Sequence, residues 1–133
     1  MDLKLENRPS ATREVRAAVD RVAESCQLRE EDRFALRVAA TEAVTNALKA
    51  GDPPVEVMIA CEGEAVDIQV ESSSIFLPKS DVEPERARDF DGGRGIPIMI
   101  ALVDEIEFAR TRAGTRVRMR KRIHPAGEGD SPF

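Results

Sequence analysis

VEVMIACEGEAVDIQV, residues 55–70, carries the strongest secondary-structure signal in this chain of 133 residues. Apolar and polar side chains alternate on both sides of the turn-forming triplet Glu62-Gly63-Glu64. Successive side chains of a β-strand point to opposite faces, so this pattern predicts a β-hairpin. Its two strands are local neighbours that need no crossover connection.

Working outward from this hairpin, the pattern of apolar residues predicts most of the remaining fold. It predicts a strand at 2–6, helices at 11–26, 30–50 and 96–103, and a second hairpin from strands at 105–110 and 115–121. Residues 71–93 are predicted to form a long loop, and residues 124–133 a disordered tail. We therefore expect one α+β domain over residues 1–123, a two-layer sandwich whose mixed, mostly antiparallel sheet has helices on one face.

Composition argues against several classes of protein. The net charge of -5 argues against a general affinity for nucleic acid or anionic membranes. No apolar run reaches the roughly 18 residues of a membrane-spanning helix, and no signal segment is present, so a cytoplasmic protein is expected. Cys26 and Cys61 lack metal-ligand spacing and are predicted to be small buried apolar residues.

The predicted helix 30–50 contains the first candidate site. Glu42 and Asn46 are four residues apart and share one helical face, with Lys49 beside Asn46. Such a carboxylate and carboxamide can hold Mg²⁺ through oxygen, or the carboxylate can act as a general base. The plain alternative is a solvated helix face. Phe34, Val38, Thr41, Thr45 and Leu48 mark one face of this helix.

The glycine-rich stretch DFDGGRGIPIM, residues 89–99, contains the second candidate site. Glycine lets backbone N–H groups approach an anion closely. Pro97 suits the first turn of the helix that follows, where free N–H groups and the helix dipole also favour an anion. Arg94 adds a positive charge. The alternative is a plain turn before a helix.

Together, these two features resemble the nucleotide site of the histidine-kinase-like ATPase superfamily. EAVTNALKAG, residues 42–51, resembles its N-box. GGRGIPIMIALVDEIEF, residues 92–108, resembles its second glycine box in the form seen in bacterial anti-sigma factor serine kinases. GTRVRMRK, residues 114–121, resembles its closing strand. The predicted element order also matches, and the resemblance spans roughly residues 3–123.

The resemblance implies a site for ATP and Mg²⁺. In such a site, Asn46 would coordinate Mg²⁺, Glu42 would be the general base, and Lys49 would lie near the phosphates. Residues 78–93 would form the ATP lid, and Thr115 would lie near the adenine. Backbone N–H groups of the glycine box would cradle the phosphates, at Gly92, Gly93, Arg94, Gly95 and Ile96.

The chain departs from this family at the first glycine box, Asp-x-Gly-x-Gly. In VESSSIF, residues 70–76, Glu71 stands where the family has the Asp that accepts a hydrogen bond from the adenine amino group. Ser73 and Ile75 stand at the two glycines. Ile75 either fills the adenine slot or packs into the core, if the loop is shifted by one residue.

Two further features are assigned no catalytic role. The alternating arginines of TRVRMRKR, residues 115–122, are expected to lie on an exposed sheet face rather than to form a nucleic-acid stripe, since no aromatic residues accompany them. His124 is the only histidine, which argues against a serine-hydrolase triad.

The resemblance implies an anti-sigma factor of the serine-kinase type. Such a protein sequesters a sigma factor and, with ATP and Mg²⁺, phosphorylates a serine on an antagonist of the STAS type. A homodimer is expected, and no direct contact with nucleic acid or membrane. The alternative is a nucleotide-free partner-switching module that regulates by protein contact alone. The ATPase domain of a larger sensor kinase is less expected, because the sequence has no histidine-bearing dimerisation helix.

Overall fold

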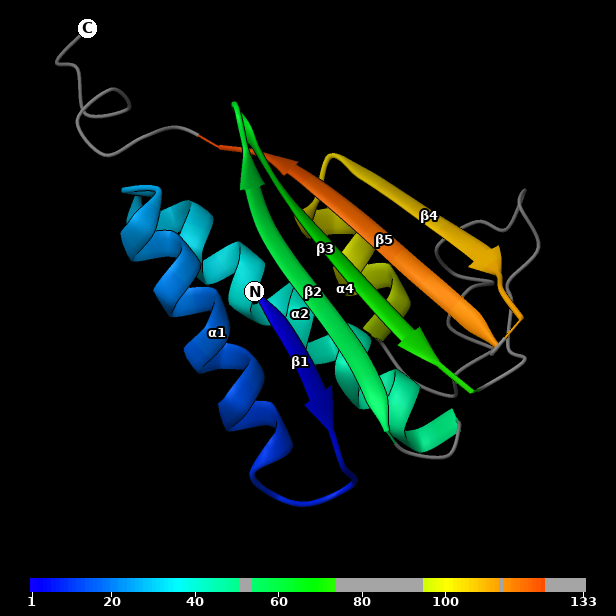
Figure 1. Cartoon of the computed structure of the whole chain (residues 1–133). Helices are drawn as coiled ribbons and strands as arrows, with labels where there is room; N and C mark the ends of the chain where they lie inside the picture. The colour runs from blue at the N-terminus through cyan, green and yellow to red at the C-terminus, as the bar shows by residue number, and fades with distance from the viewer. Residues whose placement is uncertain (51–53, 74–94, 113, 124–133) are drawn as a thin grey trace, which may run out of the picture.

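The protein is described by a computed structural model that covers residues 1–50, 54–73, 95–112 and 114–123. In these residues, the described helices lie on one face of a five-stranded sheet (Figure 1). The elements are β1 (Asp2–Leu5), α1 (Ala11–Ser25), α2 (Glu30–Ala50), β2 (Val55–Glu62), β3 (Ala65–Ser72), α4 (Gly95–Leu102), β4 (Glu105–Arg110) and β5 (Thr115–Arg122). The expected long loop and the tail 124–133 lie almost wholly outside the described residues.

The sheet has the strand order β1-β2-β3-β5-β4, and each of these described pairings is antiparallel. The predicted α+β two-layer sandwich is therefore confirmed, and no parallel pairing occurs among the described strands. None of the helices in the described part of the chain is long and apolar enough to cross a membrane.

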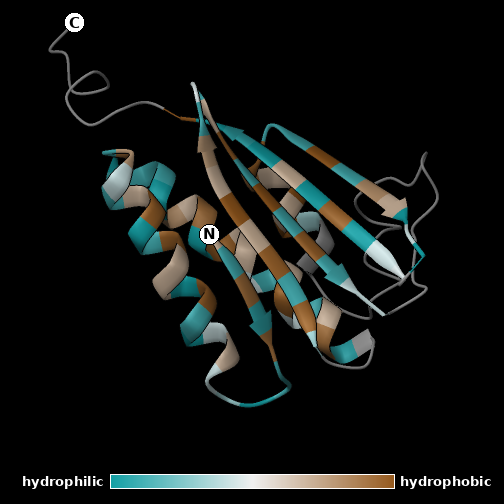
Figure 2. Ribbon diagram, in the orientation of Figure 1, coloured by the Kyte–Doolittle hydropathy of each residue, from teal (hydrophilic) through white to brown (hydrophobic). Residues whose placement is uncertain are grey.

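The central hairpin forms as its alternation predicts. Ile59 lies opposite Ile68, and Val57 lies opposite Val70, so all four side chains point to the helix layer and are buried. Figure 2 shows the alternation as brown and teal bands along the strands. The turn uses Gly63 in the left-handed region, at φ 60°, which glycine adopts without steric cost.

Helix α2 packs through a different face from the one marked in the sequence. Its buried side chains are Ala35, Leu36, Ala39, Ala40, Ala43, Val44 and Ala47. Phe34 is 63% exposed, and Val38, Thr41, Thr45 and Leu48 are only half-buried. Small alanine side chains allow the helix to approach its neighbours closely, which outweighs the weaker apolar character of that stripe.

Helices α1 and α2 are also joined by charged groups. Arg33 Nε donates a hydrogen bond to Asp20 Oδ1 over 2.9 Å, and Arg37 Nε lies 3.6 Å from the same oxygen. The hydrogen bond with Asp20 raises the pKa of the Arg33 guanidinium above its usual range.

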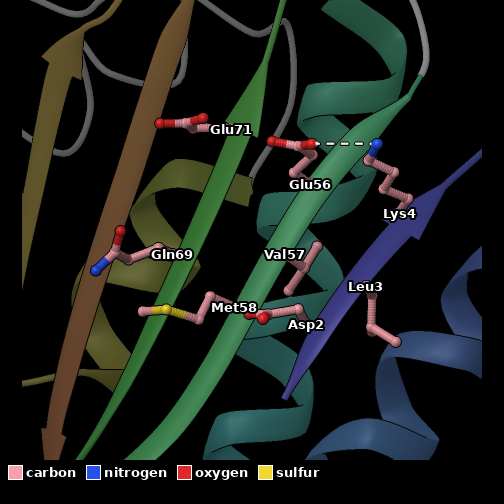
Figure 3. Close-up of a pocket in the computed structure, with 8 residues that line it drawn as sticks. All are labelled: Asp2, Leu3, Lys4, Glu56, Val57, Met58, Gln69 and Glu71. Carbon is pink, nitrogen blue, oxygen red and sulfur yellow. Dashed lines mark ion pairs between the residues drawn. The ribbon is translucent and has the colours of Figure 1, made fainter.

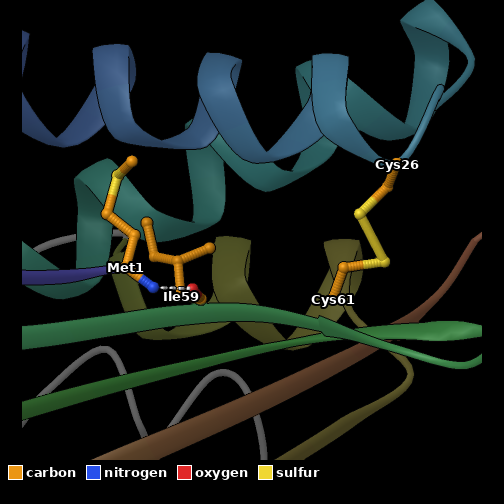
Figure 4. The surroundings of a disulfide bond; sticks show 4 residues. All are labelled: Met1, Cys26, Ile59 and Cys61. Atoms are coloured by element: carbon orange, nitrogen blue, oxygen red, sulfur yellow. Dashed lines mark hydrogen bonds between the residues drawn. A yellow bond between two sulfur atoms is a disulfide. The ribbon is translucent and has the colours of Figure 1, made fainter.

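Cys26 and Cys61 correct a prediction. The structure joins them in a disulfide between the end of α1 and β2 (Figure 4). Both residues are half-buried at the margin of the core. Their pairing lies across 35 residues of chain, a separation at which local sequence patterns give no signal of contact.

The turn between β4 and β5 depends on Gly114. The backbone of Gly114 and that of Thr111 exchange N–H···O hydrogen bonds of 2.9 and 3.3 Å. A Cβ added to Gly114 would lie 2.2 Å from the carbonyl oxygen of Ser72, and the residue has φ 153°. This close approach lets β5 begin directly beside the end of β3.

We expect Gly114→Ala to destabilise the domain by about 3 kcal/mol, because the added methyl meets backbone atoms that have no room to move. Gly63→Ala is the matched control. It also forces a positive φ, but open space surrounds its Cβ, so a loss of about 1 kcal/mol is expected. Urea denaturation measures both. Equal losses for the two variants would contradict the importance of the contact between Gly114 and Ser72.

Candidate functional site

Several of the site residues predicted from the sequence gather at one end of the domain. α2 ends at Ala50, shortly before β2 begins, and the beginning of β2 pairs with the end of β3. There Ser72 lies opposite Thr115, the first residue of β5. Figure 1 shows the C-terminal end of α2 near the same ends of these strands. The topology therefore brings the N-box helix and the closing strand together.

The N-box residues lie on the second half of α2. The helix runs without a break past both Glu42 and Asn46, so these residues are one turn apart on one face. Both side chains are half-buried, and Lys49 is exposed one turn further on. Their oxygens are of the kind that Mg²⁺ prefers. No group of three or more His, Cys, Asp or Glu side chains that could hold a metal ion is found among the described residues.

Helix α4 presents its N-terminus toward this end of the domain. It begins at Gly95, with Pro97 in its first turn as predicted, and it packs against α2. Its C-terminal end leads into β4, whose first residue, Glu105, pairs with Arg120 near the far end of β5. The N-terminus of α4 therefore points back toward Thr115. Ile96 lies in its first turn, whereas Gly92, Gly93, Arg94 and the expected lid 78–93 lie outside the described residues.

At the end of β3, the structure places Glu71 on the face of the sheet that turns away from the helices. Glu71 lies 3.8 Å from Arg116 in an ion pair, and Figure 3 shows it above the sheet with Gln69 and Glu56. Glu71 therefore does not face α2, where the resemblance required the adenine contact. Strand alternation accounts for this placement, because Val70 before it points to the helix layer.

Ser72 takes the helix side of β3 instead. It is 8% exposed and lies opposite Thr115, which is 5% exposed. Ser72 was not among the site residues predicted from the sequence, although the alternation of the hairpin, continued by two residues past Val70, places it on the helix side. Ser73 is exposed and follows the strand, and its backbone lies against Gly114. Ile75 lies outside the described residues.

The arginines of β5 lie on the outer face of the sheet, as expected. Asp67 of β3 is almost fully buried beneath them, with Arg118 at 3.5 Å and Arg120 at 3.3 Å. Arg120 also lies 3.7 Å from Glu105, and Arg116 pairs with Glu71. Three of the four arginines are thus neutralised by acids on neighbouring strands, which leaves little net positive charge for a nucleic-acid backbone.

A surface cleft of about 420 Å³ also lies on the outer face (Figure 3). It is lined by Asp2, Leu3, Lys4, Glu56, Val57, Met58, Gln69 and Glu71. Lys4 and Glu56 form an exposed ion pair of 3.8 Å across its rim. The sheet separates this cleft from α2, so it is no part of the candidate nucleotide site.

Comparison with known proteins gives two findings. A family model described as the histidine kinase-like ATPase domain matches residues 5–121. A crystal structure of the RsbU and RsbW domains of Rv1364c from Mycobacterium tuberculosis is similar with a TM-score of 0.71 and 22% sequence identity. The similarity covers 95% of this chain and 33% of that one, and it shows a shared fold.

No curated protein matches the chain significantly. The family match nevertheless covers nearly all of the described elements, from the end of β1 to the last residues of β5. This chain belongs to the histidine-kinase-like ATPase domain family.

Proposed function

We propose that this protein is an anti-sigma regulator of the partner-switching type, which binds ATP with Mg²⁺ and phosphorylates a serine of a STAS-type antagonist. The observation that carries the proposal is the meeting of three elements at one end of the domain. These are the N-box face of α2, the N-terminus of α4 and the buried hydroxyls of Ser72 and Thr115. The RsbW domain named in the similar crystal structure supports the regulatory context. Sequestration of a sigma factor and homodimer formation are parts of the same proposal.

Each group has a role that its chemistry allows. The amide oxygen of Asn46 would hold Mg²⁺, which supplies charge neutralisation for the phosphates when bound. Free N–H groups in the first turn of α4 would bind phosphate oxygens. Lys49, one turn beyond Asn46, would add positive charge nearby. The Glu42 carboxylate would accept the proton of the substrate serine as its oxygen takes the γ-phosphoryl group and ADP leaves.

At the end of the site where the adenine would lie, we assign to Ser72 the role that was expected of Glu71. This role is the hydrogen bond with the adenine amino group. Ser72 and Thr115 share the helix side of the sheet, and Glu71 does not. Shifting the first glycine box by one residue aligns Ser72 with the family's Asp. A hydroxyl both donates and accepts a hydrogen bond but carries no charge. This replacement is also what favours the second candidate, a nucleotide-free module that regulates by protein contact.

We expect Asn46→Ala to lower the affinity for Mg-ATP by about tenfold or more, because it removes a ligand of the cation. Isothermal titration calorimetry measures the affinity. Asn7→Ala, an exposed asparagine before α1, is the matched control and should bind like the wild type. Equal affinity for wild type and Asn46→Ala would refute the role of Asn46. No binding by the wild type would favour the nucleotide-free module.

The two neighbours at the end of β3 should differ in their effect on binding. Ser72→Ala is expected to weaken nucleotide affinity about fivefold through the loss of one hydrogen bond. Glu71→Ala removes a larger and charged group from the outer face, and we expect a change of less than about twofold. The same calorimetry compares them. A larger loss of affinity in Glu71→Ala than in Ser72→Ala would instead support Glu71 as the residue that contacts the adenine.

Glu42→Gln is expected to slow phosphoryl transfer about 100-fold or more while the affinity for Mg-ATP changes little, since the amide cannot accept the serine proton. Transfer of labelled phosphate from ATP to a panel of STAS-domain proteins measures the rate. Glu30→Gln, in the exposed first turn of the same helix, is the control. A Glu42→Gln variant that transfers phosphate at the wild-type rate would exclude Glu42 as the base.

A further inference from the structure

We propose that the disulfide between Cys26 and Cys61 is a reversible redox switch that attaches the end of α1 to the sheet. This inference does not rest on the proposed kinase function. It rests on where the two cysteines lie, on their exposure, and on what surrounds them (Figure 4).

The disulfide joins two elements that are distant in the sequence. Cys26 is the residue directly after α1, and Cys61 lies near the end of β2, 35 residues later. Their Cα atoms are 6.7 Å apart. The ion pairs of Asp20 hold α1 to α2, not to the sheet. The disulfide is therefore a covalent link between the helix layer and the sheet.

Both cysteines are partly exposed to solvent. Each is half-buried at the margin of the core and lies outside the fully buried cluster. Thiol–disulfide exchange needs a thiolate to reach one of the two sulfurs, so partial exposure permits reduction without global unfolding. A fully buried disulfide would be protected until the domain unfolds.

The surroundings suit the reduced state as well as the oxidised one. Val22 and Ala23 on α1 and Leu28 after it pack against the core near Cys26. A reduced cysteine is a small apolar side chain with a weak donor, so both thiols fit at this apolar margin. Reduction should therefore loosen the end of α1 and leave the sheet folded.

The redox step is thiol–disulfide exchange with a low-molecular-weight disulfide, such as oxidised glutathione. The thiolate of one cysteine attacks that disulfide, releases one glutathione thiol and forms a mixed disulfide. The thiolate of the second cysteine then attacks the sulfur of the first cysteine in this mixed disulfide, which forms the Cys26–Cys61 bond and releases the second glutathione thiol. The two protein thiols lose two electrons and two protons, which the glutathione disulfide takes up.

The switch lies away from the candidate nucleotide site. Cys61 is next to the turn between β2 and β3, whereas the site lies at the other end of these strands, near Val55 and Ser72. Its effect on α2 would pass through the contact between α1 and α2. A failure of the proposed nucleotide binding, measured by calorimetry, can therefore be told apart from a failure of the proposed switch, measured by thiol counting and thermal unfolding.

The test equilibrates the full-length protein in oxidising and reducing glutathione buffers. Free thiols are then trapped with an alkylating reagent and counted by mass spectrometry, and thermal unfolding is measured in the same buffers. We expect no alkylated cysteine in the oxidised form and two in the reduced form. Because the bond closes a loop of 35 residues, we expect the oxidised form to melt about 10 °C higher, reversibly.

Amide hydrogen exchange locates the effect. On reduction, amides around residues 22–28 should lose protection, while those of β3 and β5 keep theirs. Cys26→Ser and Cys61→Ser are matched variants whose melting temperature should be the same in both buffers. The comparison of oxidised and reduced wild-type protein remains valid even where Cys26→Ser or Cys61→Ser does not fold well.

Three results would overturn the proposal. The first is alkylation of both cysteines in the oxidising buffer. The second is the same melting temperature for oxidised and reduced wild type. The third is a bond that joins only separate chains, seen as a dimer that reducing agent dissociates on a denaturing gel.

Discussion

The rest of this structure depends on the close packing of an alanine-rich helix face against the apolar face of the central hairpin. Ala39, Ala40 and Ile68 are completely or almost completely buried where α2 crosses the sheet. Alanine adds little apolar area, but it brings the helix backbone near the strands, and each larger aliphatic side chain buried there contributes roughly 2 kcal/mol. With the helix axis fixed in this way, the rotation of α2 is fixed too. Glu42 and Asn46 consequently stand at the edge of the layer, where both are half-buried.

The alternation of side chains along each strand, which places the apolar residues in the core, also decides on which face of the sheet each polar side chain lies. One face of β3 and β5 carries Ile68, Val70 and the hydroxyls of Ser72 and Thr115. The other face carries charged side chains that neutralise one another around the buried Asp67. A one-residue difference in position thus separates a group beside the helices from a group in solvent. Within β3 and β5, the neutral polar side chains of Ser72 and Thr115 stand on the helix side at the end near the C-terminus of α2.

Most of the fold could be predicted from the sequence because its elements have strong local patterns. The two hairpins and the helices of 15 and 21 residues were placed to within about a residue or two, since alternation and helical spacing are properties of neighbouring residues. The packing face of α2 was misjudged because alanine is a weak apolar signal beside Phe34. The pairing of Cys26 with Cys61 was missed because it depends on how α1 lies on the sheet. The candidate site was predicted at α2 and at Glu71 of β3. Glu71 lies on the outer face because strand alternation puts Val70 and Ser72 on the helix side.

In the proposed alignment, Ser72 takes the position of the family's Asp, and its hydroxyl would let this chain keep the family fold with or without a nucleotide. A carboxylate at a position only 8% exposed would carry a large desolvation cost whenever no ligand donates to it. A serine hydroxyl at the same position costs far less, because it can turn toward a neighbouring backbone or side-chain group. In the proposed site, a hydroxyl in place of the carboxylate would therefore weaken the selection of adenine over other bases, and it would remove a reason for the empty site to be unstable. The fold's stability would then not depend on a nucleotide at this position, and it would rest on the core beneath α2.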